Sequence, residues 1–204
     1  MQKRGEVTRQ ALIRATAELI AAGGPGNAGL VNICRRAGVS RGALYHHFST
    51  TEELAAEVYA QARAAIAALA DTAFAGPAES AAARFSSALG AALRDDPTVR
   101  AGMQLGPDGS SEPPRLREEV LDSVRLAVAG RLAAERGLFS QGVRDLAELA
   151  VAVTAGLESL GHVDRTWWEP KTSERVWRRI SALFDPARGG SAGPDESSGP
   201  AQLP

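Results

Sequence analysis

The chain has 204 residues, of which 44 % are hydrophobic and 23 % are charged, and its formal net charge is −1. These values are ordinary for a globular protein with a core of its own. Alanine and leucine are abundant and runs of β-branched residues are absent, which favours an all-α fold. The single cysteine, Cys34, excludes an intramolecular disulfide and a four-cysteine zinc site.

The charge is unevenly distributed along the chain. Residues 1–50 hold seven basic and two acidic side chains, a net charge of +5, which leaves −6 for the remainder. A basic head on an acidic body is compatible with a nucleic-acid partner, although a solvated charged face would give the same asymmetry. Arg14 and Glu18 interrupt the apolar run near the start, so no secretory segment is expected. No stretch approaches the ~20 apolar residues of a membrane span, and we expect a cytoplasmic protein.

Apolar spacing predicts four helices in the first part of the chain. The first covers residues 8–22 and ends at the glycine-rich stretch 23–26. The second covers residues 30–37, with Asn27 or Gly29 as its cap. Ser40 is a favoured N-cap for a third helix that reaches Phe48. Thr50 and Glu53 form a capping box for a fourth helix, which can extend to residue 74.

Five further helices bring the expected total to about nine. They cover residues 78–93, a short segment that begins at Pro97, and residues 116–135, 144–160 and 173–184. Residues 106–114 read as a loop. The helix pattern divides the chain into a basic head over residues 1–50 and a helical body over 51–185, and the composition of residues 186–204 predicts a disordered tail.

A tight turn joins the second and third helices. The second helix is apolar on one face, Gly38 provides the turn, and Val39, Leu44 and Phe48 would face inward. This pattern predicts a helix-turn-helix, whose second helix enters the major groove of DNA. The N-terminus of that helix at Ser40 also favours a phosphate. The side chains left for the groove or the phosphates are Arg41, Gly42, Ala43, Tyr45, His46 and His47.

The segment "ICRRAGVSRGALYHHFSTTEEL" resembles the DNA-binding signature of the tetracycline-repressor (TetR) family of bacterial transcription regulators. The similarity extends from about residue 8 to residue 58. It implies a homodimer with two DNA-reading heads and a double-stranded operator as partner. It also implies that residues 1–50 are the DNA-binding domain and that residues 51–185 are the effector-binding and dimerisation domain, which binds a small-molecule effector. Carried over by position, it implies DNA contacts at Ser40, Arg41, Tyr45 and His46, with Gly42 and Ala43 at the base edges.

Two positions depart from that family pattern. The family often has Thr or Ser as the cap of the second helix, where this chain has Ala28 and Gly29. It usually has a lysine just before the glutamates of the fourth helix, where this chain has Thr51. Thr51 can still donate a hydrogen bond to a phosphate. Losing the lysine removes about one phosphate contact, so we expect weaker DNA binding rather than none.

A narrower resemblance concerns the second half. The segments "RDDPTVRAG", "AERGLFSQGV" and "AVTAGLES" resemble the γ-butyrolactone autoregulator receptors of streptomycete-type bacteria. Those receptors repress antibiotic-biosynthesis genes and release DNA when a small lactone or furan signal binds. They usually carry a pocket Trp on the helix that matches residues 116–135, where this chain has Val120, Leu121 and Val124. A different signal, an antibiotic intermediate or a pseudo-receptor therefore stays open.

The effector pocket is expected to be an apolar cavity with a few polar groups. Polar side chains among apolar neighbours are the stronger candidates, because a buried polar group needs a partner. The alternative for each is an ordinary core position, and the tryptophan pair could also form a lid or a dimer contact. The candidates are Phe85, Leu89, Met103, Gln104, Leu126, Thr154, Glu158, Trp167 and Trp168.

The last two helices are the expected dimer interface. The helix over residues 144–160 is apolar on more than one face, so it needs protein on both sides. Two copies of these helices would form a four-helix bundle, and the alternative is burial within one subunit. The expected anchors are Val153, Leu157, Trp177, Ile180 and Phe184.

No residue set indicates catalysis, a metal or a cofactor. His46 and His47 are adjacent on a helix and point about 100° apart, so they would not share one ion. Asp95–Asp96 precedes Pro97, where capping explains it better than acid–base chemistry. Cys34 is better explained by packing than by redox sensing.

The sequence therefore predicts a ligand-released transcriptional repressor, not an enzyme. The alternatives are a regulator of efflux or catabolic genes that responds to an unrelated apolar ligand, and a helical protein-interaction module without DNA function.

Overall fold

The computed structural model describes residues 2–181, which form nine α-helices, two short 3₁₀ helices and no strand. The predicted all-α class and the number of helices are confirmed. The elements are α1 (Gln2–Gly23), η1 (Pro25–Asn27), α2 (Leu30–Ala37), α3 (Arg41–His47), α4 (Thr51–Phe74), α5 (Ala78–Asp95), α6 (Pro97–Gly102), α7 (Leu116–Arg136), α8 (Gln141–Val163), η2 (Arg165–Trp168) and α9 (Pro170–Ile180). Phe184 and the tail predicted over residues 186–204 lie outside the described residues.

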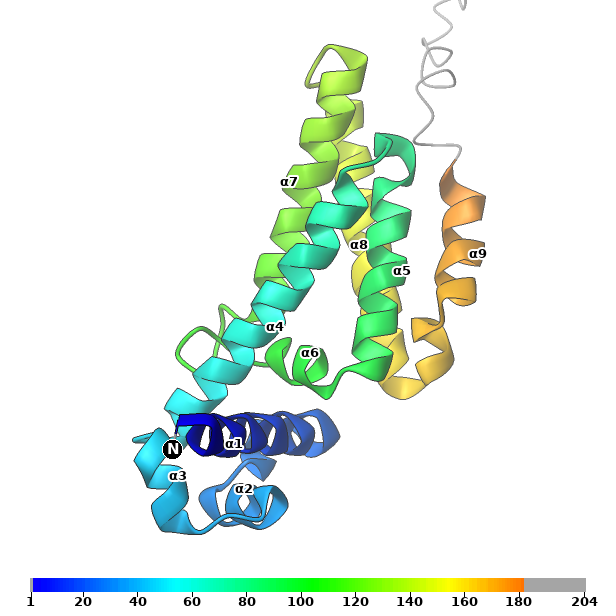
Figure 1. The fold of residues 1–204 in the computed structure, drawn as a ribbon. Coiled ribbons are helices and arrows are strands. Elements are labelled where there is room, and N and C mark those ends of the chain that lie inside the picture. Colours follow the sequence, from blue (N-terminus) through cyan, green and yellow to red (C-terminus); the bar gives the residue numbers. More distant parts are fainter. Residues whose placement is uncertain (1, 182–204) are drawn as a thin grey trace, which may run out of the picture.

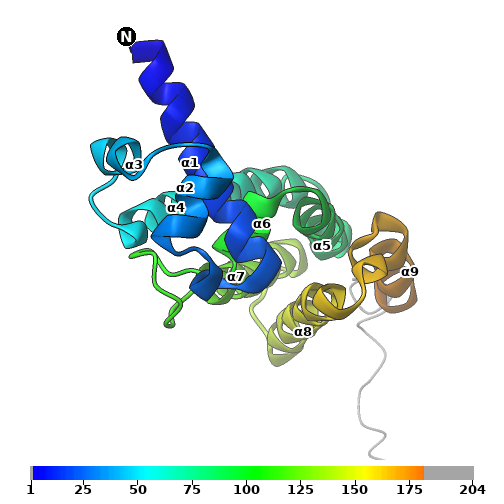
Figure 2. The same ribbon diagram turned by 90° about the horizontal axis from the view of Figure 1, so that it is seen from below.

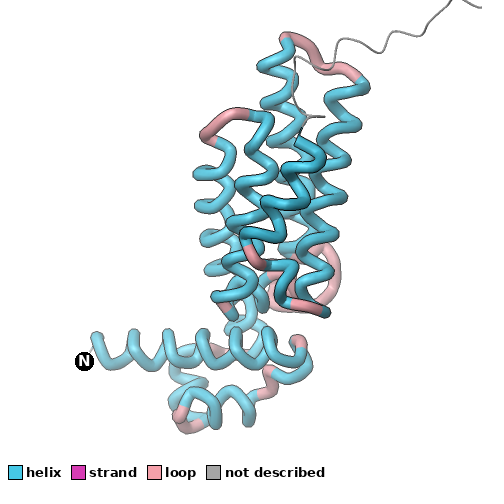
Figure 3. Tube along the Cα trace, turned by 90° about the vertical axis from the view of Figure 1, so that its right-hand side faces the viewer, coloured by secondary structure: helices cyan, strands magenta, loops and turns pink. Residues whose placement is uncertain are grey.

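The helices form a small head and a long body (Figure 1). Helices α1 to α3 gather at one end, and α1 lies across the long axis of the body helices (Figure 3). Helix α4 begins in the head and continues along the body, where α5, α7, α8 and α9 accompany it. Seen from below, α6 lies between α1 and the body helices (Figure 2). Helices α4 and α6 therefore connect the two parts.

Several helix ends follow from local capping. Ser40 Oγ accepts a hydrogen bond from the Ala43 amide at 3.2 Å, and Thr50 Oγ1 accepts one from the Glu53 amide at 3.0 Å. Asp96 Oδ1 accepts the Thr98 amide at 2.7 Å, as the capping interpretation of that aspartate predicts. Each such cap stabilises a helix by about 1 kcal/mol. Gly29 caps α2 without a side chain.

Three helices begin at least three residues before their predicted starts. Helix α8 covers Gln141–Val163 rather than residues 144–160, because Ser140 Oγ accepts the Val143 amide and caps the earlier start. Helix α1 begins at Gln2 rather than residue 8, because nothing before Thr8 except Gly5 disfavours a helix. Helix α9 begins at Pro170 rather than Ser173, because proline is favoured at the first helical position and the following amides bond the Glu169 carbonyl.

Helix α8 comes closer to a membrane-span composition than the sequence interpretation allowed. By length and apolar content alone it could cross a membrane, a test that the core helix of a soluble protein also passes. Its inner face is buried at Val143, Ala147, Ala150 and Leu157, where it packs against α5 and α7. Its apolar content therefore has a structural use inside this fold.

Candidate DNA-binding and effector sites

The head is built around a helix-turn-helix. Gly38 ends α2 in the left-handed region at φ 67°, a conformation that favours glycine, and the Val39 amide donates to the Cys34 carbonyl at 3.0 Å. Leu44 and Phe48 are buried, as predicted, together with Ile33. Cys34 is buried too, in keeping with a packing role.

The predicted DNA-reading residues lie on the open side of α3. The side chains of Arg41, Tyr45 and His46 are exposed, and Tyr45 is 56 % exposed although it is aromatic. Arg41 has no ion pair with another described residue. Gly42 is exposed and Ala43 is half-buried, so the helix has no large side chain at these two positions.

His47 differs from its neighbours. It is half-buried, its ring meets the His46 ring edge-on at 5.2 Å between centroids, and its Cε1 lies beside Gly5 of α1. Its ring therefore lies toward α1. Among the described residues no group of three His, Cys, Asp or Glu side chains could hold a metal ion.

A polar groove of about 290 Å³ lies between α3 and the first turn of α4. Tyr45 and Thr51 both line it, so the structure brings these two predicted DNA contacts together. Thr51 Oγ1 lies 3.3 Å from Glu52 Oε2, within hydrogen-bond distance. The pKa of the exposed Glu52 carboxyl is lowered by its own backbone amide and by Thr50, so the groove carries one negative charge at its rim at neutral pH.

Part of the basic charge of the head is neutralised within the chain. Arg9 pairs with Glu57 at 2.7 Å, and its guanidinium lies 5.3 Å from the centre of the Phe48 ring. Arg36 and Arg14 both pair with Glu18, and their hydrogen bonds lower the pKa of that carboxyl. These contacts fix α2 and α4 to α1. Sequence counting could not separate such structural arginines from those available to DNA.

Four of the nine predicted effector residues meet in the body. Leu89, Thr154, Glu158 and Trp168 line one small space between α5, α8 and η2. Its volume is about 10 Å³, close to the minimum that a single water needs. Thr154 is satisfied by Ser86, with the two hydroxyl oxygens 2.8 Å apart. This cluster is closed core packing in the present conformation.

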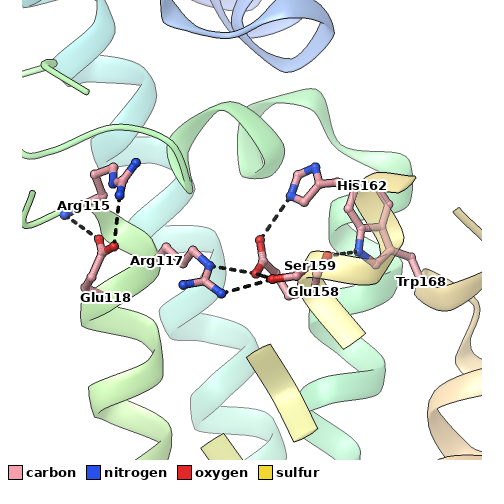
Figure 4. A network of polar contacts seen from close by, with 7 residues as sticks. All are labelled: Arg115, Arg117, Glu118, Glu158, Ser159, His162 and Trp168. Atoms are coloured by element: carbon pink, nitrogen blue, oxygen red, sulfur yellow. Dashed lines mark hydrogen bonds and ion pairs between the residues drawn. The ribbon is translucent and has the colours of Figure 1, made fainter. Parts of the chain in front are cut away.

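Glu158 is the centre of a polar network beside that space (Figure 4). Its carboxylate accepts from Arg117 of α7 at 2.8 Å and lies 3.1 Å from His162 Nε2. Burial raises the pKa of Glu158, but the hydrogen bonds to His162 and Arg117 outweigh burial and hold it below its ordinary value. Trp168 Nε1 donates to the Glu158 carbonyl at 3.0 Å. Nothing in the sequence pairs Arg117 with Glu158, which lies 41 residues away.

The other effector candidates lie elsewhere. Phe85 is buried against Phe74, Met103 is buried at the end of α6, and Trp167 is half-buried in η2. Gln104 lies beside Gly24 at the end of α1, outside the interior. Leu126 is 72 % exposed on the outer face of α7, so its prediction as a pocket residue is wrong.

The predicted dimer anchors divide into two groups. Leu157 and Trp177 are buried within the single chain, so for them the intrachain alternative holds. Val153 and Ile180 are half-buried. The outer face of α8 instead presents an apolar stripe at helical spacing, hereafter the α8 stripe. Its members are Leu149, Ala152, Val153, Gly156, Leu160 and Val163.

Two glycines show how closely the body approaches the head-bearing helix α4. A Cβ on Gly102 of α6 would lie 2.1 Å from Ala62 Cβ. Gly109, at φ 81°, places the loop before α7 so close that a Cβ there would lie 2.2 Å from the Glu52 carbonyl oxygen. Further along, Tyr59 donates to Glu119 of α7 at 2.5 Å. These contacts hold α4 closely against α6, α7 and the loop before α7.

Comparison with known proteins identifies the type of head. Residues 12–58 match the model of bacterial regulatory proteins of the tetR family. In this segment the chain carries a DNA-binding head of the tetR type. Among similar solved structures is the TetR family protein CprB from S. coelicolor A3(2), with 26 % identity, a TM-score of 0.66 and coverage of 88 % of each chain. CprB is also known in complex with its biological operator sequence, with 25 % identity, a TM-score of 0.65 and the same coverage.

The narrower resemblance is confirmed as a likeness of fold. A gamma-butyrolactone receptor described as an ArpA-like protein matches with 24 % identity and a TM-score of 0.63, over 89 % of this chain and 98 % of that one. A structure described as the molecular basis for control of antibiotic production by bacterial hormones matches with 21 % identity and a TM-score of 0.59, over 87 % and 95 %. No curated protein sequence matches the chain significantly.

Proposed function

We propose that this chain is a cytoplasmic, homodimeric repressor of the TetR family that binds a palindromic operator and is released from it by a small-molecule effector. The observation that carries the proposal is the exposed face of α3, where Arg41, Tyr45 and His46 make no ion pair with other described residues. An exposed tyrosine beside an unpaired arginine on a short capped helix suits contact with DNA. The complex of CprB with its operator supports the same use of this head.

The groove between α3 and α4 supports a phosphate contact. Tyr45 and Thr51 offer hydroxyl donors from its two sides. Phosphate contacts set the register of a protein on DNA, whereas base-edge contacts read the sequence. In this proposal Tyr45, His46 and Thr51 position the helix, Ser40 and His47 fix its ends, and Arg41, Gly42 and Ala43 lie at the base edges.

Release is proposed to act through α4. An effector shifts the conformation only if it binds the DNA-free arrangement more tightly. Helix α4 is held to the body at Ala62 by α6, at Tyr59 by α7 and at Glu52 by the loop around Gly109. Separation of these contacts moves both heads of the dimer relative to the operator half-sites. The fold shared with gamma-butyrolactone receptors supports a lactone, butenolide or furan signal and control of antibiotic biosynthesis.

The test is binding of the purified protein to its own upstream intergenic DNA, with and without an organic extract of the producing culture. Wild-type protein should shift the DNA, and the extract should abolish the shift. Tyr45→Ala should weaken binding at least about tenfold, the size of a lost charge-assisted contact. The matched control is Phe139→Ala, which removes an equally exposed aromatic at the far turn between α7 and α8.

The outcomes separate the elements of the proposal. Equal affinity of wild type and Tyr45→Ala would contradict the placement of the recognition helix. A shift that the extract leaves untouched would contradict release by a signal of that culture and direct the search to antibiotics and their intermediates.

A further inference from the structure

The body has an open apolar groove that the sequence did not indicate, at a place different from the predicted effector cluster. It lies between α4 and α7 and has a volume of about 240 Å³, whereas the predicted cluster leaves about 10 Å³. Apolar side chains of the two helices provide most of its surface, and four of its nine lining residues are charged or polar, among them the carboxylates Asp71 and Glu119. The residues that line it are Arg63, Ile66, Ala67, Ala70, Asp71, Leu116, Glu119, Val120 and Ser123.

The polar rim of this groove offers hydrogen-bond donors. Arg63 is 63 % exposed, and its Nε donates to Glu119 Oε2 at 3.3 Å. Its guanidinium also interacts with the Tyr59 hydroxyl. Both carboxylate oxygens of Glu119 are engaged, one by Arg63 and one by Tyr59. Burial and the hydrogen bond to Glu119 raise the pKa of Tyr59 to about 12, so this phenol stays a donor at neutral pH.

We propose that this groove is the effector site, and that it takes a small apolar molecule ending in an oxygen acceptor, a carbonyl or an acid group, which Arg63 binds. The regulatory role of this site, release of DNA on ligand binding, rests on the function proposed above. The apolar part of the ligand lies along Ile66, Ala67 and Val120, and burial of that area supplies the affinity. The acceptor competes with Glu119 for the Arg63 guanidinium.

Occupancy of the groove bears directly on α4. The Arg63–Glu119 and Tyr59–Glu119 contacts are polar links between α4 and α7. A ligand that takes Arg63 removes one of them and inserts its apolar part between the two helices. The DNA-reading head lies at the N-terminal end of helix α4. A small tilt of this helix near Ile66 therefore becomes a larger displacement at Thr51. The groove is therefore suited to couple ligand binding to release.

The experiment uses two fluorescent probes that differ by one acid group. 1-Anilinonaphthalene-8-sulfonate has an acceptor for Arg63, and N-phenyl-1-naphthylamine has none. Each is titrated into the full-length protein and into three variants, with folding checked by circular dichroism. Ala67→Trp fills the groove from an exposed position on α4. Arg63→Met removes the guanidinium. Ala88→Trp is the matched control, because it fills the other apolar groove, between α5 and α9.

The expected results differ between probes. Ala67→Trp weakens binding of both probes at least about tenfold, and Ala88→Trp changes neither. Arg63→Met weakens the sulfonate about tenfold and leaves the neutral probe unchanged. Glu119→Gln strengthens the sulfonate, because the competitor for Arg63 loses its charge. In wild type the sulfonate also lowers affinity for upstream DNA, and Ala67→Trp is insensitive to it.

The contrary results are equally clear. If Ala88→Trp abolishes probe binding and Ala67→Trp does not, the ligand lies between α5 and α9 and the inference is wrong. If Arg63→Met lowers the affinity for both probes equally, the proposed bond between Arg63 and the acceptor group is wrong. A bound probe without effect on DNA affinity overturns the coupling. DNA binding without any probe is measured on the same proteins, so its failure would contradict the proposed function and leave the titration result standing.

Discussion

Thr51 occupies the position where the motif that this head resembles usually has a lysine. It is half-buried at the first residue of α4 and lines the same groove as Tyr45. We expect Thr51→Lys to tighten DNA binding, because an ammonium at this rim adds a phosphate contact. The plot of log affinity against log salt should steepen by about 0.9.

The control for that change is Ala64→Lys, which adds the same charge at an exposed site further along α4. Affinity and salt slope should be measured for both variants by mobility shift at three salt concentrations. Equal steepening in the two variants would assign the effect to net charge and contradict a local phosphate site.

Gly161 is a second residue whose identity is set by a close contact. A Cβ there would lie 1.9 Å from Trp168 Nε1, within the rigid indole ring. Gly161→Ala should lower the free energy of unfolding by about 1–3 kcal/mol, because the ring must leave its site or the helix must shift. Gly130→Ala, in open space on α7, should instead raise it by up to about 1 kcal/mol. Urea unfolding of the two variants and wild type measures both values.

These residues show where sequence reasoning ends. Ser40, Thr50 and Asp96 could be assigned as caps because their partners lie two or three residues away. Gly161 and Trp168 belong to different elements, and only the fold brings them together. The same holds for Gly109, whose neighbour is the Glu52 carbonyl in another helix.

At the scale of helices, the Glu158 network joins α7 to α8. The pKa of this buried carboxyl is lower in the folded chain than its ordinary value of about 4.5. The stability that it contributes is therefore complete above that value and is lost as the pH falls through the lower, folded pKa. The free energy of unfolding of wild type should exceed that of Glu158→Gln by about 1–3 kcal/mol at pH 7, and this difference should shrink below about pH 4.5.

Urea unfolding at pH 7, 5 and 4 measures that difference. Glu148→Gln is the control, because it removes the same charge from an exposed pair with Arg125, which contributes little. If the difference in free energy of unfolding between wild type and Glu158→Gln stays constant down to pH 4, Glu158 stabilises the fold by packing and not by its ionised carboxylate.

Periodicity predicted most helices well and their lateral contacts poorly. The bounds of α2 match the prediction at both ends because Gly29 and Gly38 end the apolar pattern within the chain itself. The predicted effector residues were chosen as polar groups among apolar ones. Thr154 and Glu158 proved to be satisfied by Ser86 and Arg117, partners that a sequence cannot reveal. The groove at Arg63 escaped notice because it depends on the spacing between α4 and α7.

For the whole molecule, the basic head and the acidic body could be predicted from composition, whereas the exposed apolar faces could not. Helix α8 was expected to be apolar on two sides, and in the structure these two sides face different surroundings. Leu157 faces the interior, and the α8 stripe faces outward. Val163 at the end of that stripe is 89 % exposed. A row of exposed aliphatic side chains along one helix is characteristic of a surface that another protein covers.

A second copy of the chain is the partner that the proposed function requires, since two heads must span two half-sites. Two α8 stripes facing each other around a two-fold axis would bury Leu160 against its symmetry mate. We expect Leu160→Glu to raise the dimer dissociation constant at least about tenfold, because it places two carboxylates in an apolar interface. Leu138→Glu puts the same charge on an exposed leucine at the turn before α8 and should leave the dimer intact.

Sedimentation velocity over a range of protein concentrations distinguishes the two variants, and the mobility shift then connects assembly to DNA. If the α8 stripe forms the dimer, Leu160→Glu sediments as a monomer and loses affinity for the palindrome, although each head is intact. A DNA fragment with a single half-site binds only one head. The weak affinity of Leu160→Glu for such a fragment should therefore equal that of wild type. A Leu160→Glu protein that remains dimeric would move the interface away from α8, with the half-buried face of α9 around Ile180 as the next surface to alter.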